Sequence, residues 1–173
     1  VNVPCLIARL RCRSAIDEGN FDNVDVFATK AYDLQPGEVE LPILVYQPLV
    51  AKGRKDLADK IFATAKKSIQ KVGDDYPNCA WAHNSAAWLS ACCKTDLNWG
   101  LSQAEAAIKL DGKSAAHLDT LAEVLFQLNR QKEAVEAQTK AVALEPTKVY
   151  YKKQLKRIQN GDTNVDRPEE NDD

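Results

Sequence analysis

Residues 115–148 read AAHLDTLAEVLFQLNRQKEAVEAQTKAVALEPTK, and this stretch decides the fold. Its first half places apolar residues three and four apart, on one stripe of a helix: Leu118, Leu121, Ala122 and Leu125. Its second half carries Ala134 and Ala141, whose small side chains let a second helix approach the first closely. Pro146 then ends the second helix, because proline cannot continue one. The stretch therefore predicts a pair of packed helices.

This pattern resembles the 34-residue tetratricopeptide (TPR) repeat. A TPR unit has W-x2-L-G-x2-Y in its first helix (helix A), A-x3-F in its second (helix B) and a closing proline. One unit cannot bury its own apolar stripe, so the resemblance implies that neighbouring units stack against it. The implied fold is all-α, a right-handed α-solenoid of about four TPR-like helix pairs with a C-terminal capping helix.

Alanines recur at one address when the chain is followed in steps of one repeat. Ala31, Ala65, Ala107 and Ala141 are separated by 34, 42 and 34 residues. This phasing predicts four units with eight extra residues between the second and the third: 5–38, 39–72, 81–114 and 115–148. A short amphipathic helix at 149–160 is predicted to cap the repeat domain, which spans 1–160. Residues 161–173 are predicted to form an acidic, disordered tail.

The match to the TPR pattern differs among the units. In the second unit Ala58, Phe62 and Ala65 reproduce the helix B pattern. In the first unit Arg11 stands where a large apolar residue is expected, which indicates a terminal cap or a helix shifted by one residue. The run NSAAWL at 84–89 resembles a variant found in bacterial TPR proteins, often within longer multidomain chains. This resemblance and the absence of Met together imply a processed chain or a fragment of a longer one.

Charge and hydropathy argue against two classes of partner. The net charge is −2, with −5 on residues 161–173 and +3, in interspersed signs, on the rest. Such a body lacks the basic patch of a nucleic-acid-binding protein. No segment approaches 18 uncharged apolar residues, so no membrane span is expected. We expect a soluble chain, cytoplasmic by default, although a missing targeting segment would leave the compartment open.

Few side chains are arranged for chemistry. The five cysteines lack zinc-finger spacing, and an odd number is a poor disulfide framework. His83 and His117 are 34 apart, which fits packing between repeats better than a metal site. Asp119 and Glu123 lie one helical turn apart, a spacing that acid–base catalysis can use and that an inner TPR face explains equally well. We therefore predict no enzyme activity, no metal and no cofactor.

The TPR resemblance implies that a partner binds in a concave groove formed by the A helices. The groove would be basic at one end, apolar in its middle and acidic at the other end, and its predicted residues are Arg9, Arg13, Ile43, Gln47, Leu89, Asp119, Glu123 and Phe126. The predicted function is a non-catalytic scaffold that binds a peptide or protein segment there. The alternative is a regulatory or assembly module of a larger multidomain enzyme, with other domains of the same parent chain as its partners.

Overall fold

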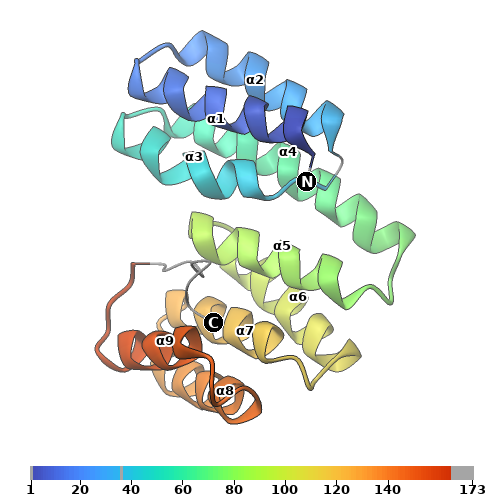
Figure 1. Cartoon of the computed structure of the whole chain (residues 1–173), viewed down its shortest axis with the longest axis vertical. Coiled ribbons are helices and arrows are strands. Elements are labelled where there is room, and N and C mark those ends of the chain that lie inside the picture. Colours follow the sequence, from blue (N-terminus) through green and yellow to red (C-terminus); the bar gives the residue numbers. More distant parts are fainter. Residues whose placement is uncertain (1, 36, 165–173) are drawn as a thin grey trace. The chain divides into compact units, whose positions relative to one another are not determined.

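The computed structural model describes residues 2–35 and 37–164, in which the chain forms nine helices and no strand. Figure 1 shows them as successive helix pairs followed by a last helix. They are α1 (Val3–Asp17), α2 (Phe21–Leu34), α3 (Glu40–Ala51), α4 (Lys55–Asp75), α5 (Ala80–Cys93), α6 (Leu97–Leu110), α7 (Ala115–Gln127), α8 (Gln131–Leu144) and α9 (Val149–Gln159). The predicted all-α architecture of helix pairs is confirmed. The chain divides into two compact parts, each larger than a single repeat. From here on the first unit is Val1–Pro77 and the second unit is Asn78–Asp173, and each is described by itself.

The first unit contains the pairs α1–α2 and α3–α4. Helix α1 packs on α2 and α3, and α4 packs on α2 and α3. On α1, Cys12 is fully buried, whereas Arg11 beside it is exposed. The apolar stripe of this helix is therefore shifted by one residue from the TPR pattern, as one of the two predicted interpretations requires.

The second unit contains α5–α6, α7–α8 and α9. Helix α7 lies at its centre, in contact with α5, α6, α8 and α9. The buried stripe includes Ala122, Leu125 and Ala134, which pack with Ile158 of α9. Leu118 and Ala141 form a further apolar cluster with Ala115. The apolar residues predicted from the 115–148 pattern thus do face the interior of the unit.

Small residues stand where helix A meets helix B. The four alanines at the shared repeat address, Ala31, Ala65, Ala107 and Ala141, are all 0% exposed. Gly100 on α6 shows how little room is left, because a Cβ atom built there would lie 2.6 Å from Cβ of Ser90 on α5. Such a distance is a steric clash, so only glycine fits at this crossing without a local shift.

Helix α4 differs from its predicted length. The predicted repeat 39–72 ends just before Gly73, but the helix continues through this glycine to Asp75. An exposed ion pair from Lys71 Nζ to Asp75 Oδ2, 2.7 Å long, spans the added turn, and glycine is tolerated in a helix at a modest cost. Pro36 and the tail residues 165–173 lie outside the described residues.

The repeat address gives a stability test on one helix. Ala141→Leu should lower the free energy of unfolding by roughly 1–3 kcal/mol, because the added carbons must enter a closed helix contact. Ala143→Leu is the matched control, since Ala143 lies on the same helix and is not buried, so it tolerates the larger side chain. Urea denaturation followed by circular dichroism measures both. Equal stability of the two variants would contradict the assigned packing.

Candidate functional site

The predicted binding residues of the first unit lie on two helices that touch. Arg9 and Arg13 belong to α1, and Ile43 and Gln47 belong to α3. Gln47 is exposed, Arg13 is partly exposed and Ile43 is buried. The structure therefore brings these four residues to one pair of neighbouring A helices, but only the polar ones reach solvent.

Arg9 is held by a carboxylate that the sequence analysis did not single out. Its Nη1 lies 3.3 Å from Oε1 of Glu38, whose side chain is only 1% exposed. The same carboxylate oxygen accepts a 2.9 Å bond from the backbone N–H of Leu41, in the first turn of α3. A carboxylate at a helix N-terminus satisfies a backbone donor that has no partner within the helix. Arg9 and Glu38 thus fasten α1 to the start of α3.

Arg13 is bound less tightly. Its Nε lies 3.3 Å from Oδ2 of Asp17, one turn further along α1, and the two side chains are 43% and 59% exposed. Exposed pairs of this kind contribute little to stability because water competes for both charges. Arg13 can therefore exchange Asp17 for another acceptor at small cost.

The predicted binding residues of the second unit are all buried. Leu89 lies on α5 and has no exposed surface, and Asp119, Glu123 and Phe126 lie on α7 in contact with residues of α8 and α9. Sequence spacing alone gave no sign of this burial. These side chains contact other helices of the unit, whereas side chains that line an open groove would be exposed to solvent.

Asp119, Glu123 and Phe126 form a buried cluster on α7, and Arg157 of α9 contacts two of its members. It forms an ion pair with Glu123, with the two side chains only 9% and 4% exposed. Its guanidinium also lies 5.5 Å from the centroid of the Phe126 ring, and its Nε donates a 2.7 Å bond to Gln154 Oε1. Arg157 is the fourth cation of the polar face of α9, a pattern that indicates a solvated basic face, yet its side chain is largely buried. The other three cations of that face are exposed: Lys152, Lys153 and Lys156.

Asp119 lies one turn before Glu123 in the same buried cluster. Its Oδ1 accepts a 2.8 Å bond from Gln138 Nε2 of α8, and its Oδ2 lies 3.4 Å from the Tyr150 hydroxyl of α9. Burial raises the pKa of Asp119 from 3.8 to about 7, and the nearby Glu123 charge adds to the rise. The hydrogen-bond donors to Asp119 are thus neutral, whereas Glu123 is paired with the charged guanidinium of Arg157.

Both histidines have hydrogen-bond partners within the second unit. His83 Nδ1 lies 2.8 Å from Gln103 Oε1, and His117 Nδ1 lies 3.3 Å from the carbonyl oxygen of Asp111. Across residues 2–35 and 37–164, no three His, Cys, Asp or Glu side chains are grouped so as to hold a metal ion. None of the helices in these ranges is long and apolar enough to cross a membrane.

These observations define a TPR-like helical-repeat fold, and solved structures with this fold match the chain. TTC0263, a thermophilic TPR protein from Thermus thermophilus, is 14% identical with a TM-score of 0.58, over 88% of this chain and 80% of that one. MamA from Desulfovibrio magneticus RS-1 is 16% identical with a TM-score of 0.53, over 93% and 86%. YrrB, a TPR protein with an unusual peptide-binding site, is 15% identical with a TM-score of 0.50, over 84% and 88%.

At these identities the likeness shows the fold. No protein-family model matches the sequence, and no curated protein matches it. The chain is a TPR-like helical-repeat protein in its fold.

Asp119 gives a pH test of the buried cluster. Because its pKa is higher in the folded state than in the unfolded one, the fold binds the proton more tightly, and this carboxyl lowers stability as pH rises from about 4 to 7. Asp119→Asn removes the titration. Relative to the wild type, the variant should gain roughly 2–3 kcal/mol between pH 5 and pH 8. Urea unfolding at four pH values measures this difference, and parallel curves would contradict the raised pKa.

Arg157 gives a second test of the same cluster. Arg157→Met should cost about 3–5 kcal/mol, because it leaves the Glu123 carboxylate buried without its partner. Lys156→Met, at the neighbouring position, is the control and should change stability little. Adding Glu123→Gln to Arg157→Met should restore part of the loss. Independent, additive effects of the two substitutions would show that the pair is not coupled.

Proposed function

We propose that the chain is a non-catalytic module that binds a peptide or protein segment along the exposed polar face of α1 and α3. Arg9, Arg13 and Gln47 make up this face, which we call the α1–α3 face. The observation that carries the proposal is the TPR-like fold, shared with YrrB, a TPR protein that has a peptide-binding site. In this chain the α1–α3 face keeps polar side chains at the surface of two touching A helices.

The three side chains have different parts in the proposal. Gln47 offers an amide that can donate to and accept from the backbone of an extended segment. Arg13 can release Asp17 and bind a carboxylate or a carbonyl oxygen of the partner, because its present ion pair is exposed. Arg9 is fixed by the buried Glu38, which also compensates its charge, so it offers N–H donors in a fixed position.

The buried residues of the predicted groove support the fold in this proposal and do not contact the partner. They are Leu89, Asp119, Glu123 and Phe126. The last three are engaged by α8 and α9: Gln138 and Tyr150 bind Asp119, and Arg157 contacts both Glu123 and Phe126. A partner would first have to displace α9 and expose a buried ion pair, which is costly. The same bonds support a structural rather than an acid–base use of the two carboxylates.

Site-specific crosslinking tests the α1–α3 face. A photoreactive amino acid at position 47 should crosslink to a specific partner in lysate, and Arg13→Glu should weaken capture of that partner about tenfold. Lys67→Glu is the matched control, because Lys67 lies on the B helix α4 and the charge change is the same. The melting temperature of both variants should stay near that of the wild type. Loss of capture with Lys67→Glu but not with Arg13→Glu would contradict the proposal.

A further inference from the structure

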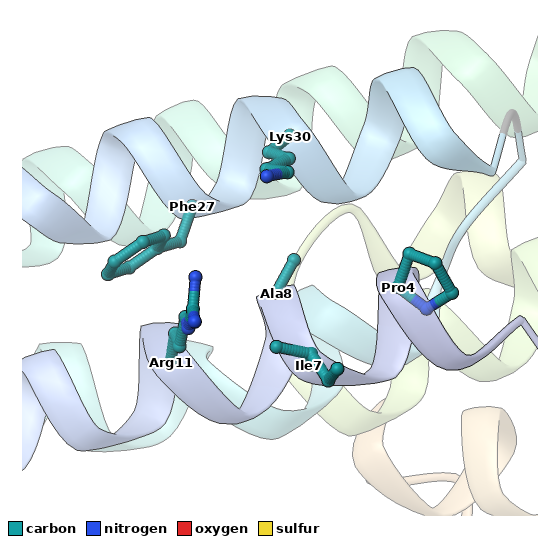
Figure 2. A pocket seen from close by; sticks show the side chains of 6 residues that line it. All are labelled: Pro4, Ile7, Ala8, Arg11, Phe27 and Lys30. Atoms are coloured by element: carbon teal, nitrogen blue, oxygen red, sulfur yellow. The ribbon is translucent and has the colours of Figure 1, made fainter.

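A pocket of about 240 Å³ opens between α1 and α2, on the opposite side of α1 from Arg9. Figure 2 shows its lining residues on the two helices, with the side chains of Arg11 and Phe27 close to each other between them. They are Pro4, Ile7, Ala8 and Arg11 of α1 and Phe27 and Lys30 of α2. Each residue turns an α-helix by about 100°, so Arg9 and Arg11 point about 200° apart and belong to different surfaces.

The surface around this pocket is unusually apolar for an exposed helix. Val3, Ile7 and Leu10 follow the helical spacing along α1, and their exposed fractions are 56%, 44% and 57%. Large apolar side chains that gather on a surface mark sites of association, whereas single ones are ordinary. The pocket is smaller than the roughly 300–1,000 Å³ of small-molecule sites, so it suits one apolar side chain.

The rim of the pocket is positively charged and has no carboxylate among its lining residues. The Arg11 guanidinium lies 5.8 Å from the centroid of the Phe27 ring, which leaves its N–H groups available. No carboxylate in residues 2–35 and 37–164 forms an ion pair with Arg11 or Lys30. Charge complementarity therefore calls for an acidic occupant.

A second pocket in the same unit provides a comparison. It lies between α2 and α4 and has a volume of about 150 Å³. Its cation, Lys60, already binds Asp25 of the same chain, with 2.8 Å between Nζ and Oδ2. The cation of that pocket is thus paired with a carboxylate from the pocket's own lining, whereas the lining of the α1–α2 pocket holds two cations and no carboxylate.

We propose that the α1–α2 pocket docks a segment of a partner protein that carries one large apolar side chain with Asp or Glu within a helical turn of it. The apolar side chain enters between Ile7, Ala8 and Phe27. The partner's carboxylates pair with Arg11 and Lys30 at the rim. A second copy of this chain is the less suitable occupant, because a two-fold contact through this pocket would bring the same cations together.

NMR titration of the full chain with three acetylated, amidated hexapeptides tests the proposal. SDFLDS carries the apolar anchor and the acids, SKFLKS reverses the charges, and SDAADS lacks the anchor. Only SDFLDS should give saturable shifts at Ile7, Ala8 and Phe27. Arg11→Glu combined with Lys30→Glu should weaken this binding at least about tenfold, and 0.5 M salt should also weaken it.

The control variants separate this pocket from the α1–α3 face. Ile7→Ala removes part of the pocket wall at an exposed position, so it should reduce binding without unfolding the chain. Arg13→Glu should leave binding of SDFLDS unchanged even if it abolishes capture at the α1–α3 face. No saturable shifts with SDFLDS at millimolar concentration, or equal binding of SKFLKS, would overturn the proposal. So would a concentration-dependent dimer that shifts the same residues without peptide.

Discussion

The close approach of helix A to helix B is the constraint on which the rest of this structure depends. At the α5–α6 crossing no side chain fits opposite Ser90, so position 100 is glycine. The four alanines that recur at one repeat position, one on each B helix, are fully buried. With the pairs packed this closely, each apolar stripe must be covered by a neighbouring helix. In the second unit α9 supplies that cover through Ile158 and Arg157.

The small residues that recur at one position of each repeat explain why the helix pairs could be predicted from sequence. Alanine at a fixed interval and apolar residues three and four apart are local signals, and tertiary packing only reinforces them. The buried ion pair could not be predicted in the same way. An arginine among three lysines on a polar helix face indicates a solvated face, and only the position of Glu123, 34 residues earlier, shows otherwise. Glu38 was missed for a similar reason, because its partners Arg9 and Cys5 are about 30 residues away.

The candidate site shows the same limit. Position within a repeat predicted that Arg9, Arg13, Ile43 and Gln47 share neighbouring helices, and they do. The same count could not show that Asp119, Glu123 and Phe126 lie under α9, because a repeat pattern does not say where the last helix packs. Burial then decides the chemistry. The buried carboxylates Glu38 and Glu123 each form an ion pair with an arginine. Asp119 instead accepts hydrogen bonds from the Gln138 amide and the Tyr150 hydroxyl, and burial raises its pKa.

The cations on α1, α2 and α9 also bear on how copies of the chain behave in concentrated solution. Helix α9 exposes Lys152, Lys153 and Lys156, and the apolar stripe of α1 is flanked by Arg11 and Lys30. Copies that approach through either surface present positive charge to positive charge. Like charges therefore oppose a two-fold contact through the apolar stripe of α1. Added salt screens this repulsion, so high ionic strength should promote self-association through the very surface from which it releases an acidic partner.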